Sequence, residues 1–246
     1  MRFASSPYRA LTCVNDVIVQ LEQEPWRFAS QNRAEICAFW HERKRSQPYL
    51  YDGQVHVMTS WAVVDGDTGS ATFVGRLVRV NFASFLYWKH FDTNSQQGFD
   101  FSGGAAILCR DGALLMVVSG ARTIRPGTLE FPSGFVDVSD FEDDMLNFKR
   151  HVEREAAEEL AITSGQLGEP TQYLLSAADG VVQVLSIFRI ESTGDEFTKN
   201  WRWRSGNLRS EISDVVAIYP SSDLANFSMQ AHVKEAVAHL LESSRR

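Results

Sequence analysis

Two pairs of apolar runs, each centred on a polar dipeptide, dominate the second half of the chain. Asp-Gly between apolar runs favours the tight turn of a two-residue hairpin, so each pair predicts two antiparallel β-strands. The first pair covers residues 105–109 and 113–119 around Asp111-Gly112, and the second covers residues 171–178 and 181–190 around Asp179-Gly180.

The remaining periodic segments predict further strands and two helices. Residues 214–219 form a short apolar strand pattern, and apolar residues at helical spacing after Ser228 predict a closing helix with that serine as N-cap. The first hundred residues are rich in aromatic side chains, most of which we expect in a core. Their pattern predicts strands over 14–21, 54–63 and 72–81 and a helix over 32–45.

Composition bounds the class of protein. With 44% hydrophobic and 22% charged residues the chain is typical of a globular protein. A net charge of −7 argues against broad binding to nucleic acid, whose phosphates favour Lys and Arg. We find no apolar run of membrane-spanning length and no signal peptide, so we expect a cytoplasmic protein without a membrane partner. Three cysteines without metal-ligand spacing are expected to be reduced.

One predicted helix carries a cluster of acids. Residues 154–162 read Arg-Glu-Ala-Ala-Glu-Glu-Leu-Ala-Ile, which places Glu155, Glu158 and Glu159 on one helix face. Carboxylates side by side repel one another, so the arrangement suggests a function that supplies positive charge, and oxygen ligands favour Mg²⁺ or Mn²⁺. The alternative is a solvated acidic helix face.

A second motif lies upstream, in residues 129–140, which read Leu-Glu-Phe-Pro-Ser-Gly-Phe-Val-Asp-Val-Ser-Asp. Together the two motifs resemble the Nudix box of hydrolases that act on nucleoside diphosphates linked to another group. Gly134 keeps its place, Ser133 replaces a glycine, and Asp137 and Asp140 stand where the family usually has glutamate. The second half of the box matches at Arg154, Glu155, Ala156, Glu158, Glu159 and Ile162.

The chain departs from the box in spacing. Gly134 and Arg154 are 20 positions apart, six more than in the family pattern. Ser139 and Glu142 could form a capping box, which would start the helix near Ser139. A continuous helix would then hold Asp140 roughly 21 Å from Arg154. Either residues 141–146 bulge out, or the role of the first box glutamate is unfilled or taken by Glu142, Asp143 or Asp144.

A second departure is Ala161, which replaces the glycine that ends the family's catalytic helix. That glycine adopts a left-handed conformation, which costs a residue with a Cβ about 1 kcal/mol. Alternatively, the helix runs one more turn and ends at Gly165.

The resemblance implies a fold, an activity and a metal site. It implies an α/β (α+β) fold with a mixed β-sheet between helices, as an N-terminal α+β extension over residues 1–98 and a Nudix hydrolase domain over 99–246. It implies metal-dependent hydrolysis of a diphosphate bond, with Glu155 and Glu158 as catalytic acids and Arg154 orienting them. The metal ligands would be Glu155, Glu158, Glu159 and the Ser133 carbonyl, and the acid that takes the proton would be one of these glutamates, Glu211 or Asp214.

Candidate substrate-binding residues lie outside the box. Arg122 and Arg125 could clamp a diphosphate, and Trp201 and Trp203, expected on an edge strand, could stack a base. The segment 39–53, with Phe-Trp followed by Pro-Tyr-Leu-Tyr-Asp-Gly, resembles the extension of Nudix proteins that hydrolyse UDP-sugars. A UDP-sugar and an ADP-ribose-like compound are therefore candidate small-molecule substrates.

The competing functional class is a Nudix-fold protein that binds a nucleotide without cleaving it. The departures at Ser133, Asp137, Asp140 and Ala161 favour this class. The intact pairs of acids oppose it, because a sensor has no chemical need for a full metal cluster. The sequence does not predict an oligomeric state.

Overall fold

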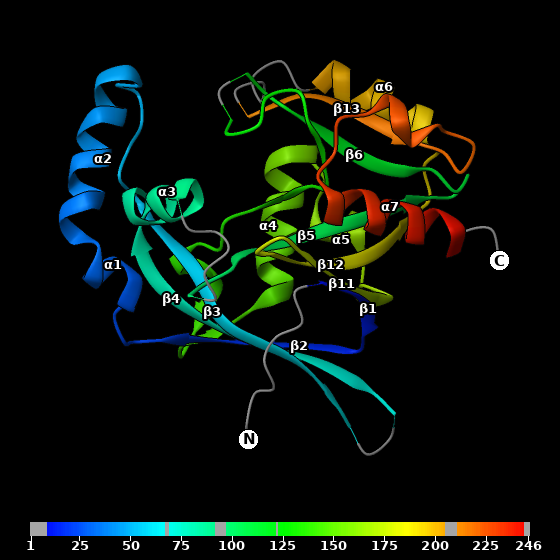
Figure 1. Ribbon diagram of the computed structural model, residues 1–246. Coiled ribbons are helices and arrows are strands. Elements are labelled where there is room, and N and C mark those ends of the chain that lie inside the picture. Colours follow the sequence, from blue (N-terminus) through cyan, green and yellow to red (C-terminus); the bar gives the residue numbers. More distant parts are fainter. Residues whose placement is uncertain (1–8, 67–68, 92–96, 122, 205–210, 244–246) are drawn as a thin grey trace.

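Two mixed β-sheets with helices around them make up the protein. The computed structural model describes residues 9–66, 69–91, 97–121, 123–204 and 211–243 (Figure 1). The eight-stranded sheet has the order β1-β11-β12-β5-β6-β13, with β7 paired to β6 and β8 to β5, and the five-stranded sheet has the order β3-β4-β2-β10-β9. This arrangement confirms the predicted α+β class.

The eight-stranded sheet contains both predicted hairpins. Strands β5 and β6 pair antiparallel around the first Asp-Gly turn, and β11 and β12 pair antiparallel around the second. Strand β12 runs parallel to β5 and joins the two hairpins into one sheet. Its strands are β1 (Arg9–Val14), β5 (Asp100–Cys109), β6 (Leu114–Ser119), β7 (Leu129–Glu130), β8 (Ser133–Gly134), β11 (Gln172–Ala178), β12 (Val181–Ile190) and β13 (Ile212–Ile218).

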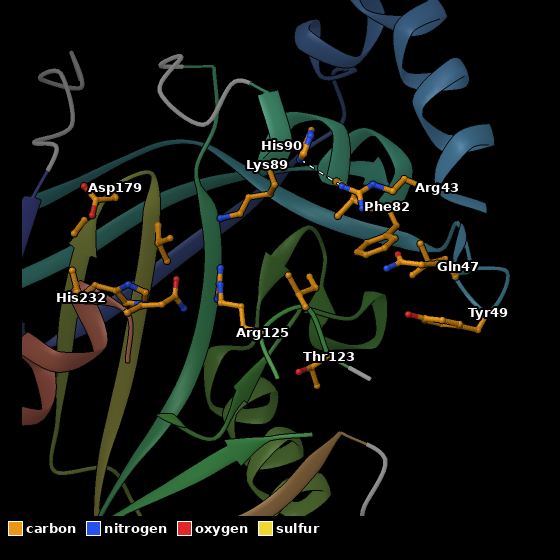
Figure 2. A pocket seen from close by; sticks show the side chains of 17 residues that line it. Arg43, Gln47, Tyr49, Phe82, Lys89, His90, Thr123, Arg125, Asp179 and His232 are labelled. Atoms are coloured by element: carbon orange, nitrogen blue, oxygen red, sulfur yellow. Dashed lines mark hydrogen bonds between the residues drawn. The ribbon is translucent and has the colours of Figure 1, made fainter. Parts of the chain in front are cut away.

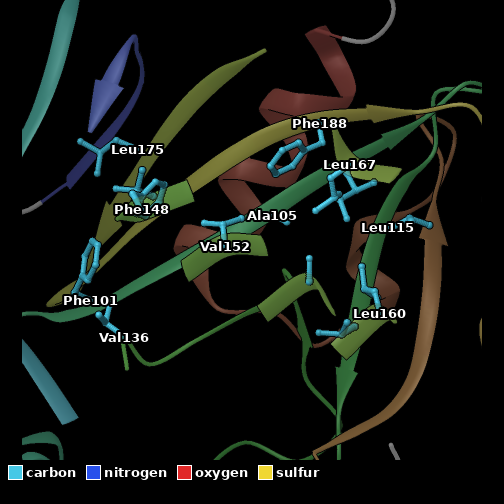
Figure 3. Packing of buried hydrophobic residues seen from close by; sticks show 14 of the residues in the cluster. Phe101, Ala105, Leu115, Val136, Phe148, Val152, Leu160, Leu167, Leu175 and Phe188 are labelled. Atoms are coloured by element: carbon cyan, nitrogen blue, oxygen red, sulfur yellow. The ribbon is translucent and has the colours of Figure 1, made fainter. Parts of the chain in front are cut away.

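Alternate residues of these strands face two different helices. Helix α4 (Phe148–Leu160) packs its Val152 and Leu160 against the sheet face that carries Ala105 and Leu115 (Figure 3). Helix α7 (Ala231–Ser243) packs on the opposite face, which carries Ala106. The sheet therefore lies between helices, as predicted, and α4 is held rigidly along the centre of the molecule. The closing helix begins at Ala231 rather than just after Ser228.

The five-stranded sheet is built mainly from the N-terminal part. Its aromatic residues Trp26, Phe28, Phe85 and Trp88 form a core of their own, while Tyr49 stays exposed. The elements are β2 (Asp16–Glu22), β3 (Gln54–Asp65), β4 (Ala71–Asn81), β9 (Phe141–Glu142), β10 (Met145–Leu146), α1 (Arg27–Gln31), α2 (Arg33–Ser46) and α3 (Phe82–Phe91).

The six extra residues of the box form a β-hairpin, β9–β10. Asp143 and Asp144 turn the chain with φ values of 47° and 62°, and β10 pairs with β2 of the N-terminal sheet. The predicted helix start near Ser139 is therefore wrong. A short 3₁₀ turn, η1 (Val138–Asp140), comes first, and α4 begins only after Asn147, whose side chain accepts from the backbone N–H of Arg150 at 3.1 Å.

Each of the two sheets contains strands from both sides of residue 98, the predicted domain boundary. Strand β1 pairs with β11 of the eight-stranded sheet, although it precedes that residue, and β10 joins the five-stranded sheet, although it follows it. The division into residues 1–98 and 99–246 stays a proposal, and each sheet contains a strand from the other side.

Two smaller features complete the described chain. Helix α5 (Ser164–Leu167) follows α4, and a 3₁₀ turn, η2 (Leu224–Asn226), precedes α7. Cys13, Cys37 and Cys109 are free thiols. Among the described helices, none is both long and apolar enough to cross a membrane.

Ala161 ends α4 in the left-handed conformation, with φ 54° and ψ 37°. Because a Cβ makes this conformation unfavourable, Ala161→Gly is expected to stabilise the fold by about 0.5–1 kcal/mol. Thermal melts measure the change. Ala157→Gly is the matched control on the same helix, and it should destabilise by about 1 kcal/mol because glycine disfavours a helix interior. A fall in stability with Ala161→Gly would contradict the idea that the left-handed conformation of Ala161 is unfavourable.

Candidate active site

Two of the three α4 carboxylates pack against the short strand β8. Glu155 is buried, and its carboxylate lies so close to Gly134 that a Cβ on this glycine would overlap it. Glu159 accepts a hydrogen bond from the Ser133 N–H at 3.1 Å. Glu158 lies one residue earlier on the helix and is exposed. Of the three acids predicted to share this helix face, Glu155 and Glu159 thus meet the loop that carries Ser133 and Gly134, and Glu158 does not.

The environment of Glu155 and Glu159 disfavours the charged form of both carboxylates. The pKa of Glu159 is raised to about 9, mainly by burial and in addition by the charges of Glu155, Glu130 and Glu211, although the hydrogen bond from Ser133 acts in the opposite direction. Burial also raises the pKa of Glu155, although His151 and Arg154 act in the opposite direction. Carboxylates held together in this way are a suitable environment for a hard cation.

Arg154 connects the carboxylates to the upstream half of the motif. Its Nη2 lies 2.8 Å from Asp140 Oδ2, and its Nη1 lies 2.9 Å from Glu155 Oε1 and 3.3 Å from Glu158 Oε2. The guanidinium also donates to the Phe135 carbonyl at 3.2 Å. Arg154 is therefore placed to orient the acids through charge-assisted hydrogen bonds.

Asp140 takes the position that the sequence left open. Because the β9–β10 hairpin carries the chain out and back, Asp140 lies beside Arg154 instead of a long helix away. Asp140 is 1% exposed and accepts from His151 Nδ1 at 3.0 Å and from its own loop at Asp137 N–H at 2.9 Å. His151 is fully buried.

No protein-family model matches the chain, and no curated protein matches it. The solved structures that it resembles include Nudix hydrolases. A MutT protein from Methanosarcina mazei is 16% identical, with 60% of this chain and 96% of that chain covered and a TM-score of 0.42. A Nudix hydrolase from Nitrosomonas europaea is 13% identical, with 60% and 91% covered and a TM-score of 0.41.

A third solved structure is a bifunctional NMN adenylyltransferase/ADP ribose pyrophosphatase from Francisella tularensis, in complex with AMP and a Mn ion. It is 17% identical, with 59% of this chain and 42% of that chain covered and a TM-score of 0.42. These similarities are distant, so the proposed function rests on the site residues themselves.

The structure corrects the prediction for Trp201. The segment that was expected as an edge strand is part of helix α6 (Gly194–Arg204). Trp201 is 4% exposed and donates from Nε1 to the Glu159 carbonyl at 3.0 Å, so it supports the end of the Nudix-like helix and has no free ring face for a base. The side chain of Trp203 and all of Arg122 lie outside the described residues.

The remaining predicted residues lie outside α4 and β8. Arg125 forms an ion pair with Glu130 at 3.5 Å. Asp214 is held by Arg202 through two hydrogen bonds of 2.9 Å. Glu211 is exposed, and its charge contributes to the raised pKa of Glu159. Of the two acids downstream of the box, Glu211 is therefore within electrostatic range of Glu159.

A cavity of about 650 Å³ lies near these residues and was missed in the sequence (Figure 2). It is lined from both sides of residue 98, by the end of α2, the loop after it, α3, the loop 123–125, the β11–β12 turn and the start of α7. The sequence singled out Arg125 and the segment 39–53, which contribute to the lining, but no spacing rule connects positions so far apart.

Proposed function

We propose that the protein is a metal-dependent hydrolase that cleaves the diphosphate bond of a nucleoside diphosphate linked to another group. The observation that carries this proposal is the contact of Arg154 with both Asp140 and Glu155, beside a half-buried Glu159 whose pKa is about 9. Such a cluster is unfavourable by itself and becomes favourable when positive charge enters it.

The donor atoms of the candidate residues are of the kind that a divalent cation such as Mg²⁺ or Mn²⁺ prefers. All candidate donors are oxygens, which these hard ions prefer: the carboxylates of Glu155, Glu158 and Glu159 and the Ser133 carbonyl. A bound cation would neutralise negative charge that develops on the diphosphate and favour ionisation of water.

The protein's own residues supply orientation and proton transfer in this proposal. Arg154 holds Glu155 and Glu158 in place, and the Ser133 N–H holds Glu159. The proton of the attacking water passes to a carboxylate, either a glutamate of α4 or Glu211. Asp214 is the weaker choice because its carboxylate is already engaged by Arg202.

One observation favours the non-catalytic alternative, a nucleotide-binding sensor. Within the described part of the chain, no three His, Cys, Asp or Glu side chains are arranged to hold a metal ion. Glu158 pairs with Arg154 instead of meeting Glu155 and Glu159. A protein that only binds its nucleotide would need no further rearrangement.

Incubation with a panel of nucleoside diphosphate derivatives decides between the two functions. With Mg²⁺ or Mn²⁺ we expect at least one UDP-sugar, ADP-ribose or dinucleotide to be cut into two phosphate-containing products, identified by mass. In heavy-oxygen water the label should enter only one product. Excess chelator should abolish cleavage and added metal should restore it. Binding in calorimetry without cleavage under any metal would establish the sensor instead.

A further inference from the structure

The cavity between the N-terminal helices and the eight-stranded sheet is cationic, in a chain whose net charge is −7. Figure 2 shows Lys89 and Arg125 extending toward each other from opposite walls, with Arg43 on the side of α2. Among the described residues that line it, Asp179 is the one acid. A space of this kind is suited to an anionic ligand.

The carboxylates that pair with two of these cations orient them. Lys89 Nζ lies 2.9 Å from Asp100, and Arg125 Nη1 lies 3.5 Å from Glu130, and neither acid lines the cavity. Each cation therefore keeps donors for a ligand. Arg43 lies over the Phe39 ring, 5.1 Å from its centroid, and in the described part of the chain no carboxylate is within ion-pair distance of it.

A buried histidine, His232, lines the cavity together with the cations. His232 is 4% exposed and lies on the wall formed by α7 (Figure 2). Its pKa is lowered to about 4, mainly by burial and in addition by the charges of Arg125 and Lys89, although Asp100 and Asp179 act in the opposite direction. Lys89, Arg125 and His232 line the same cavity, and the charges of both cations oppose protonation of the histidine.

The rim of the cavity has a different character. Tyr49 and Ile124 line it and are 67% and 60% exposed. The Tyr49 side chain reaches toward the cavity from the loop after α2 (Figure 2). An exposed ring beside a cationic interior matches a nucleotide, whose base stacks on aromatic side chains while its phosphate binds Arg and Lys.

Two contacts connect the cavity to the α4 carboxylates. Arg125 pairs with Glu130 at 3.5 Å, and Glu130 lies three residues before Ser133, whose N–H donates to Glu159. On the other wall, Phe82 packs against Phe135, with ring centroids 6.5 Å apart, and the Phe135 carbonyl accepts from Arg154. The cavity is therefore next to the proposed catalytic site.

We propose that this cavity binds the nucleoside monophosphate half of the substrate. Arg43, Lys89 and Arg125 face its phosphate, and Tyr49 and Ile124 pack against its base. The assignment of this half to a substrate rests on the proposed hydrolase function. The binding of a nucleotide in the cavity stands independently of it.

Calorimetric titration of UMP, AMP, ribose 5-phosphate and inorganic phosphate tests the site without catalysis. Wild-type protein should bind at least one nucleotide. Arg43→Gln should lower the affinity for that nucleotide and for ribose 5-phosphate alike, by about tenfold. Tyr49→Ala should lower the affinity for the nucleotide by about tenfold and leave the affinity for ribose 5-phosphate unchanged, because only the base stacks on this ring. Arg110→Gln is the matched control, since Arg110 pairs with Glu196 at 3.4 Å far from the cavity lining, and it should change neither.

The outcomes separate this inference from the proposed function. Failure of both nucleotides to bind, or unchanged affinity in Arg43→Gln and Tyr49→Ala, overturns the nucleotide site. Hydrolysis with unchanged KM in both variants also overturns it and leaves the hydrolase. Binding that depends on Arg43 and Tyr49 without any hydrolysis supports the site and removes the hydrolase.

Discussion

Replacing Glu159 or Glu155 by glutamine is expected to lower kcat by a factor on the order of 10² or more, as expected when the charge that holds a catalytic ion is lost. The same changes should make the protein more stable. Both carboxylates have raised pKa values, mainly through burial, so their ionised forms oppose folding. Glutamine keeps the shape of the side chain and the hydrogen bond from Ser133 without the charge.

The sign of the stability effect follows from the pKa of Glu159. Folding raises it from 4.5 to about 9, so the folded state favours the protonated side chain. The stability that comes from this protonation is complete below about pH 4.5 and is lost as the pH rises toward 9. At pH 8 without divalent metal, Glu159→Gln should therefore raise the melting temperature by about 3 °C or more. Mg²⁺ should raise the melting temperature of the wild type and not that of the variant.

Glu153→Gln is the matched control, because Glu153 is on the same helix and pairs only weakly with Lys149, at 3.9 Å. Its kcat should stay within about twofold of wild type, because its ion-pair partner Lys149 does not belong to the site. Glu158→Gln tests the exposed member of the cluster and should also lower kcat. Undiminished turnover in all three site variants would show that the carboxylates are not catalytic.

Asp140→Asn is expected to destabilise the fold by about 3–5 kcal/mol, because it removes one partner of a buried charge pair. Asp140 accepts hydrogen bonds from Arg154, His151 and the backbone of Asp137 at 2.8–3.0 Å. An amide replaces an acceptor with a donor that faces these donors. The melting temperature should fall by about 10 °C, and kcat should fall as well, because Arg154 loses the partner that orients it.

Acid titration checks the electrostatic cause. Burial alone would raise the pKa of Asp140, but the hydrogen bonds from His151 and Arg154 hold it well below its usual value of 3.8. Its stabilising effect is therefore complete above about pH 4 and lost as the pH falls through the folded-state pKa. Melts from pH 7 to pH 3 should show a smaller acid loss in Asp140→Asn than in wild type.

Asp137→Asn serves as the control for this series. Asp137 is exposed, and its main contact is the hydrogen bond that it accepts from Ser139 N–H at 2.8 Å. Asparagine keeps this acceptor and is an equally good cap, so stability should change by less than about 0.5 kcal/mol. An Asp140→Asn protein that melts within 2 °C of the Asp137→Asn protein would be incompatible with a buried charge pair.

The sequence predicted what local periodicity controls. Both hairpins, the strand near residue 214, the closing helix and the carboxylate face of α4 follow from apolar spacing, Asp-Gly turns and the offsets of Glu155, Glu158 and Glu159. The left-handed end at Ala161 followed from one aligned position. Each of these features depends on residues within a few turns of one another.

Predictions failed where distant segments decide the conformation. The β9–β10 turn contains Asp143-Asp144 without glycine, and it is held by pairing with β2, more than a hundred residues earlier. A capping pair at Ser139 and Glu142 was therefore as good a signal as the true cap at Asn147. At Trp201, the Trp-Arg alternation suggested a strand, but Phe197 and Trp201 are four residues apart and pack together toward the core in α6.

Strand β1 has consequences for synthesis on the ribosome. Its partner in the finished sheet is β11, with Arg9 opposite Ala178. At a synthesis rate of about 5–20 residues per second, on the order of ten seconds or more pass between the synthesis of β1 and that of β11. During this time its hydrogen-bonding edge is available to other chains. Strands β2, β3 and β4 lie close together in the sequence and can pair early, so the first half of the protein emerges with a folded sheet and one unmatched strand beside it.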